Sequence, residues 1–126
     1  SQPMYVSVTA WFYKYLAGIS AVEPGFKKIK IRPYMPDSLN KAEGEINTPY
    51  GAVSSGWEKD ESGYILRVRV PASCEAEIIL PGGAKMRVEE SGGALKQAEG
   101  IIYSEAQGEE LHVKVKSGEY VFTARR

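Results

Sequence analysis

The chain has 126 residues, enough for one domain with a substantial hydrophobic core. Basic and acidic residues each number 16, and no apolar run reaches bilayer-spanning length, so neither nucleic acid nor a membrane is indicated as a partner. One cysteine, Cys74, and one histidine, His112, exclude an internal disulfide and a Cys/His zinc site within these residues.

The first segment, residues 1–25, is predicted to be an amphipathic helix followed by a turn. The apolar residues spaced along one helical face are Val8, Trp11, Phe12, Tyr15, Leu16 and Ile19. Pro3 suits the first helical turn, and Gly18 suits the position at which a helix ends. Because Tyr5 and Tyr13 lie off this face, the helix is expected to need more than one partner surface. A chain that begins with such a helix is expected to be part of a longer one, and to self-associate through the helix when the partner is missing.

From Phe26 onward the hydrophobic period changes to two, which is typical of strands. The expected strands cover residues 26–32, 41–48, 53–59, 64–70, 74–80, 86–88, 101–103, 111–115 and 120–123. Pro71 is expected to end the strand before it. Val53, Ser55 and Trp57 share one face, which the size of Trp57 predicts to be buried. Short strands separated by Gly and Pro turns predict a mainly β fold, a jelly-roll-like antiparallel β-sandwich, over residues 26–126.

The sequence offers few groups for catalysis. The candidate acid/base pairs are Glu75/Glu77, Glu89/Glu90 and Glu109/Glu110. Two carboxylates can hydrolyse a glycoside, but all six are expected on solvent-facing sides of strands or in turns, where nothing raises a carboxyl pKa. His112 is expected to be an exposed strand residue and Cys74 a small buried one. We therefore predict no catalytic residue, no metal site and no cofactor in this chain.

Aromatic residues are the remaining candidates for contact with a ligand. Trp57 lies on the apolar face of its strand, so core packing is favoured over sugar stacking. Tyr34 and Tyr50 stand beside prolines in expected loops. We therefore predict that carbohydrate stacking, if the chain binds a sugar, involves Tyr34 and Tyr50.

Three stretches together resemble a known family. Residues 8–19 (VTAWFYKYLAGI) and 23–33 (EPGFKKIKIRP) resemble the end of the catalytic domain of bacterial α-L-rhamnosidases, glycoside hydrolase family 78. Residues 48–57 (TPYGAVSSGW), with the strand after them, are similar to that family's C-terminal domain. The resemblance covers most of residues 3–81 and fades beyond them.

The resemblance implies two parts: residues 1–25 hold the last helix of an upstream (α/α)6 barrel, and residues 26–126 form a C-terminal β-sandwich that packs on it. It also implies that the parent releases terminal α-L-rhamnose with inversion, using a glutamate acid and a glutamate base that lie upstream and have no counterpart here. The family often carries an Asn-His pair before this helix, whose histidine borders the sugar pocket. Ser1 and Gln2 occupy those positions, so Gln2 is a candidate for the pocket edge in the parent.

The resulting interpretation is a non-catalytic C-terminal domain of a bacterial rhamnosidase-like glycoside hydrolase, with a structural role beside the barrel. One rival interpretation is a carbohydrate-binding module that contacts rhamnose-containing glycans through Tyr34 and Tyr50. Another is a free-standing interaction domain. The compartment is not assigned, because a signal peptide would precede Ser1.

Overall fold

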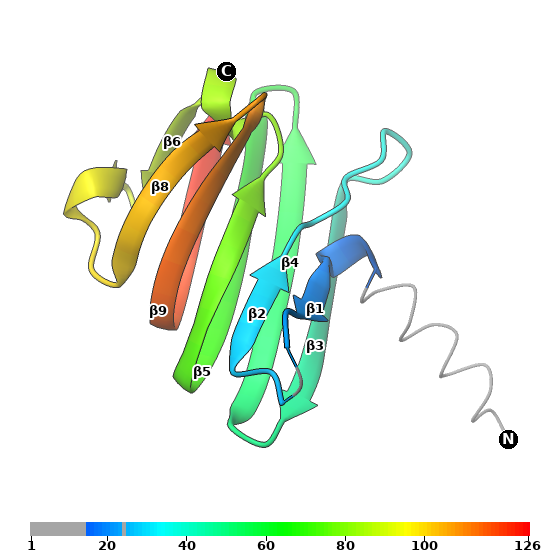
Figure 1. The fold of residues 1–126 in the computed structure, drawn as a ribbon. Coiled ribbons are helices and arrows are strands. Elements are labelled where there is room, and N and C mark those ends of the chain that lie inside the picture. The colour runs from blue at the N-terminus through cyan, green and yellow to red at the C-terminus, as the bar shows by residue number, and fades with distance from the viewer. Residues whose placement is uncertain (1–14, 24) are drawn as a thin grey trace, which may run out of the picture.

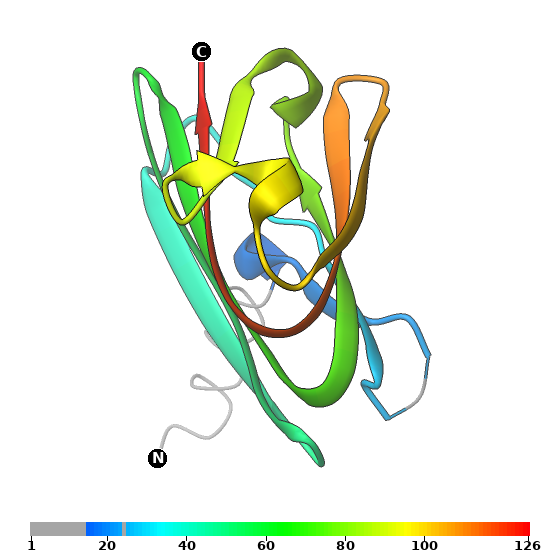
Figure 2. The ribbon, with the colours of Figure 1, turned by 90° about the vertical axis from the view of Figure 1, so that its left-hand side faces the viewer.

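The computed structural model describes residues 15–23 and 25–126, which form one continuous β-sheet folded into two facing layers (Figures 1 and 2). Its strands are β1 (Ile19–Ala21), β2 (Lys28–Ile31), β3 (Lys41–Thr48), β4 (Gly51–Asp60), β5 (Gly63–Leu80), β6 (Arg87–Glu90), β7 (Gly93–Ala94), β8 (Ile101–Gln107) and β9 (Glu110–Arg125). Two short 3-10 helices, η1 (Gly83–Lys85) and η2 (Leu95–Gln97), lie in the connections. The prediction of a mainly β fold is confirmed.

Two long strands, β5 and β9, belong to both layers because each bends near its middle (Figure 2). Their antiparallel pairing shifts register between Val70 and Glu75, and Ser73 has a positive φ of 68° at this point. An irregularity of this kind bends a strand without ending it. The prediction that Pro71 ends a strand is therefore wrong, since Pro71 lies inside β5. The strands predicted at 111–115 and 120–123 are likewise two parts of β9.

The first layer contains β3, β4, the first part of β5, the last part of β9, β6 and β7. The second contains β1, β2, the last part of β5, the first part of β9, and β8. Strand β2 runs parallel to β5, which departs from the predicted antiparallel arrangement. Parallel strands need a long connection between them. Here the chain between the paired segments passes through β3, β4 and the first half of β5, and β2 pairs with the half of β5 that follows the bend.

The hydrophobic core lies between the layers. The core side chains that are essentially inaccessible include Ile29, Ile31, Val53, Trp57, Leu66, Ala76, Ile78, Leu80, Val113, Val115, Phe122 and Ala124. Strand alternation places them on the inner faces of both layers. The predicted buried face of β4, which carries Val53, Ser55 and Trp57, is confirmed.

The end of the N-terminal helix packs into this core. Residues 15–17 are helical, and Gly18, with a φ of 77°, ends the helix as predicted. A Cβ at Gly18 would lie 1.9 Å from the carbonyl oxygen of Arg32, so only glycine fits. Ile19 belongs to β1 and not to the helical face predicted for it. Ala17 and Ile19 belong to the same core as the strands, so the core extends across the predicted domain boundary at residues 25 and 26, which stays a prediction.

Much of the predicted helix lies outside the described residues, including Val8, Trp11, Phe12 and the candidate pocket residue Gln2. Among the described residues, no helix combines the length and the apolar character needed to cross a bilayer.

Candidate functional site

The last carbonyl groups of the N-terminal helix accept hydrogen bonds from the inner face of β4. The indole Nε1 of Trp57 donates to the carbonyl oxygen of Leu16 at 2.9 Å, and the hydroxyl of Ser55 donates to that of Ala17 at 2.8 Å. The backbone N–H of Tyr34 donates to the same Leu16 oxygen at 3.0 Å. We call Ser55, Trp57 and the Tyr34 N–H the helix-end site. It satisfies carbonyl groups that a helix terminus leaves without intrahelical partners.

The helix-end site is almost completely buried. Leu16, Ala17, Ser55 and Trp57 are each 2% exposed or less. A buried carbonyl without a partner is costly, so these donors matter more here than at a surface helix end. The spacing of the donors fits that of the acceptors. Ser55 and Trp57 are two residues apart on a strand, which puts both on one face, and they donate to the carbonyl groups of the consecutive residues Ala17 and Leu16. Alternation predicted that Ser55 and Trp57 share a buried face, but their hydrogen-bond partners could not be predicted from it.

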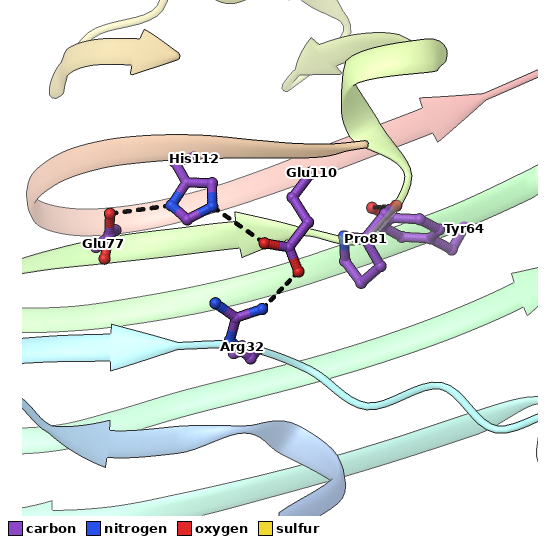
Figure 3. A network of polar contacts seen from close by, with 6 residues as sticks. All are labelled: Arg32, Tyr64, Glu77, Pro81, Glu110 and His112. Atoms are coloured by element: carbon purple, nitrogen blue, oxygen red, sulfur yellow. Dashed lines mark hydrogen bonds and ion pairs between the residues drawn. The ribbon is translucent and has the colours of Figure 1, made fainter. Parts of the chain in front are cut away.

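A second polar cluster lies on the outer face of the second layer (Figure 3). The Glu110 Oε2 atom accepts a hydrogen bond from the Arg32 guanidinium at 2.5 Å, and its Oε1 atom lies 3.2 Å from His112 Nε2. The other ring nitrogen, Nδ1, lies 3.1 Å from Glu77 Oε2. We call these four residues the Glu110 network. Because Arg32 directly follows β2, whereas Glu110 and His112 belong to β9, the network connects these strands across β5.

Electrostatics in the Glu110 network favour the ionised form of the Glu110 carboxylate. Partial burial acts to raise the pKa of Glu110, but the hydrogen bond from His112 and the charge and hydrogen bond of Arg32 outweigh it, so the pKa lies below the ordinary 4.5. A general acid at neutral pH needs a pKa shifted upward. Glu110 is therefore suited to an ion pair and not to acid catalysis.

Two predictions about exposure are wrong. His112 is only 7% exposed, because its ring lies between the Glu77 and Glu110 side chains. Glu90 is 8% exposed, since its Oε2 accepts hydrogen bonds from the Val121 N–H at 3.0 Å and from the neighbouring Ser91 hydroxyl. Period-two alternation could not identify either case, because it does not report that Glu77 comes from β5 to cover His112, or that the Val121 N–H and the Ser91 hydroxyl bind Glu90.

The other carboxylates identified in the sequence that form ion pairs do so on the surface. Glu75 lies 3.1 Å from the Lys114 ammonium, and Glu109 lies 3.5 Å from that of Lys85. Within residues 15–23 and 25–126, no group of three or more His, Cys, Asp or Glu side chains is arranged to hold a metal ion. Cys74 is buried, as predicted, and burial raises the pKa of its thiol.

The two candidate sugar-stacking residues lie on separate loops. Tyr34 follows β2 and is 48% exposed, whereas Tyr50 lies in the turn between β3 and β4 and is 40% exposed. The Tyr34 ring pairs with that of Tyr15, with centroids 5.4 Å apart and planes inclined by 56°. The backbone N–H of Tyr50 donates to the Thr48 hydroxyl oxygen at 3.1 Å, which stabilises the turn. A sugar-binding role for Tyr34 and Tyr50 stays a prediction.

Comparison with known proteins places these features in a family. The model of the bacterial alpha-L-rhamnosidase C-terminal domain matches residues 18–95. An alpha-L-rhamnosidase of Formosa agariphila is 27% identical over 121 residues, which cover 96% of this chain and 13% of that protein.

Solved structures of longer proteins contain the same fold. The alpha-L-rhamnosidase from Dictyoglumus thermophilum matches 98% of this chain with a TM-score of 0.82 and 31% identity, over 14% of its own length. The Streptomyces avermitilis enzyme, solved with L-rhamnose, matches 94% with a TM-score of 0.76 and 27% identity, over 11% of its length. This chain therefore corresponds to a small part of each relative. Its match over residues 18–95 shows that it belongs to the bacterial alpha-L-rhamnosidase C-terminal domain family.

Proposed function

We propose that this chain is the non-catalytic, structural C-terminal domain of an α-L-rhamnosidase, and that it supports the catalytic part by fixing the helix that joins them. The helix-end site carries this proposal. Ser55 and Trp57 use their side-chain donors on the carbonyl groups of Ala17 and Leu16, so the helix end is held inside the domain that follows it. A domain that anchors a neighbouring helix needs such contacts and needs no acid/base pair.

The strength of this attachment follows from burial. Each side-chain hydrogen bond contributes about 1 kcal/mol, and leaving a buried carbonyl unpaired costs about 1–3 kcal/mol. Burial of the Leu16 side chain adds roughly 2 kcal/mol. Because the donors and acceptors are neutral, the attachment does not depend on the charge state of any side chain. The helix end is therefore fixed in position under all conditions in which the sheet is folded.

We assign the chemistry to the longer protein. The resemblance of residues 8–33 to the end of a rhamnosidase catalytic domain supports an upstream (α/α)6 barrel. There, a glutamate acid and a glutamate base would hydrolyse terminal α-L-rhamnosides with inversion. Within this chain, Glu75, Glu77, Glu109 and Glu110 are committed to ion pairs or to the His112 ring. The lowered pKa of Glu110 opposes an acid role.

The proposal is tested by comparing this chain with the longer protein encoded by the same gene. An aryl α-L-rhamnoside should be hydrolysed by the longer protein and not by this chain. Deleting residues 26–126 from the longer protein should lower the melting temperature of what remains. Turnover that co-purifies with this chain alone would overturn the non-catalytic assignment, and an unchanged melting temperature would overturn the structural role.

A second candidate function is carbohydrate binding, favoured by the exposed Tyr34 ring and its partner Tyr15. Aromatic rings at a surface offer stacking faces to a sugar. Titration with rhamnose and with rhamnosylated oligosaccharides, followed by NMR, tests this at millimolar ligand. Saturable shifts that are lost in Tyr34→Ala or Tyr50→Ala would favour the binding module over the structural role.

A further inference from the structure

Exposed apolar side chains are concentrated next to the helix end. The large hydrophobic residues with the greatest exposure among the described residues are Tyr15, Val22, Tyr34, Tyr50, Ile102 and Tyr103. Three of these six lie within residues 15–34, where the helix enters the sheet. We propose that Tyr15 and Tyr34 form the surface on which the catalytic part of the longer protein docks, an inference that rests on the proposed function.

The two rings have a rigid base. The Tyr34 N–H is bonded to the Leu16 carbonyl oxygen, which also accepts the Trp57 indole bond, and Tyr15 directly precedes Leu16. The backbones of both tyrosines are therefore tied to the buried helix-end site, although their rings are about half exposed. A preorganised pair of side chains loses little conformational freedom when a partner covers it. Such an arrangement favours a specific contact over an adaptable one.

Ring geometry favours a protein partner over a sugar. The planes of Tyr15 and Tyr34 are inclined by 56°, so the pair offers no common flat face on which one sugar ring could stack. Inclined rings instead present an edge and a face together, an arrangement into which aliphatic and aromatic side chains pack well.

The catalytic part of the same protein is the occupant that fits a patch of this size. The solved relatives are several times longer than this chain, which covers 14% and 11% of them. A covalently tethered partner has a high effective concentration, so a small contact suffices. A free dimer would need about 800 Å² from each partner, more than two half-exposed tyrosines provide. The patch therefore suits an interface between domains of one chain and not an association of separate chains.

The test uses Tyr34→Ser, with Tyr103→Ser as the matched control. Tyr103 is 52% exposed, close to the 48% of Tyr34, but lies on β8 at the edge of the second layer. In this chain, both variants should unfold at the wild-type temperature. In the longer protein, Tyr34→Ser should speed proteolytic cleavage between the catalytic part and the sandwich by up to about tenfold, the effect of losing one aromatic contact. Tyr103→Ser should leave that rate unchanged.

Each other outcome is informative. If Tyr34→Ser and Tyr103→Ser behave alike in the longer protein, the docking surface is wrong. The docking surface is also wrong if rhamnosides shift the Tyr34 ring signals saturably in the longer protein, since the ring would then be free to bind sugar. If Ser55→Ala speeds the cleavage and Tyr34→Ser does not, the docking surface fails while the proposed function stands. If neither variant has an effect, both fail.

Discussion

The N-terminal segment, residues 15–34, is attached to the two layers in different ways. At the helix-end site, Ser55 and Trp57 of the first layer bind neutral carbonyl groups in a fully buried position. In the Glu110 network, Arg32 is bound to β9 of the second layer by an ion pair whose side chains are 50% and 35% exposed. One attachment is neutral and dry, and the other is charged and in contact with water. We expect the buried hydrogen bonds to fix this segment and the exposed ion pair to add little to them.

Burial decides the difference in strength. Exposed ion pairs contribute about 0–1 kcal/mol, because water and salt screen the charges and two long side chains lose freedom. Buried hydrogen bonds also have a modest net value, but their removal leaves an unpaired group that costs about 1–3 kcal/mol. The helix-end site should therefore dominate, although the Glu110 network has the shorter and more highly charged contact.

Removing the segment altogether should have the largest effect. A variant that starts at Phe26 loses the buried Leu16, Ala17 and Ile19 together with β1. Loss of one large buried aliphatic side chain costs about 2–5 kcal/mol, and whole domains are stable by only about 5–15 kcal/mol. We therefore expect the Phe26 variant to show no cooperative thermal unfolding transition when its near-UV circular dichroism is monitored. A variant that starts at Tyr15 serves as the control and should keep it.

This expectation reverses the one that follows from a domain boundary at residue 25, under which the sandwich folds without the helix and becomes more monomeric. Cooperative unfolding of the Phe26 variant at the wild-type temperature would restore that boundary. It would also mean that the buried contacts of Ala17 and Ile19 contribute little.

Ser55→Ala tests the helix-end site with a smaller change. It removes the donor to the Ala17 carbonyl without a large change in volume, so the free energy of unfolding should fall by about 1–2 kcal/mol. Ser54→Ala is the matched control, because Ser54 is the adjacent residue on the opposite face of β4, and its effect should stay within about 0.5 kcal/mol. Urea denaturation measures both. Equal effects would show that the hydroxyl of Ser55 has no special role.

Glu110→Gln tests the charged attachment and should have the smallest effect. The folded-state pKa of Glu110 is lowered below 4.5, so its ionised form stabilises the protein above that pH, and the contribution is lost as pH falls through the lowered pKa. We expect Glu110→Gln to cost below about 1 kcal/mol at neutral pH, and less in acid or at high salt. The measurement is urea denaturation at several pH values.

Glu109→Gln is the control for this series, since Glu109 lies next to Glu110 but forms its ion pair with the exposed Lys85, at 3.5 Å. Its effect should be near zero at every pH. A cost for Glu110→Gln that exceeds that of Ser55→Ala would reverse the ranking of the two attachments.

Local pattern explains much of the fold. Alternation in residues 53–57 identified the buried face of β4, because a Trp of this size is accommodated in the core and not in water. The position of Gly18 identified the helix end, because a left-handed residue there ends a helix. The same alternation is seen in β2, where Ile29 and Ile31, two residues apart, are both buried. In each case the signal lies within a few residues of the feature that it predicts.

The sequence by itself therefore determined the mainly β class, the faces of several strands, the exposure of Tyr34 and Tyr50, and the resemblance that the family match bears out. Only the tertiary structure decided that β5 continues through Pro71, that β2 runs parallel to it, and that His112 is enclosed by Glu77 and Glu110. It also decided that Ser55 and Trp57 bind the helix end. The physical reason is distance along the chain. Periodicity reports which side of a strand is apolar, whereas hydrogen-bond partners 35 to 41 residues away depend on how the layers come together.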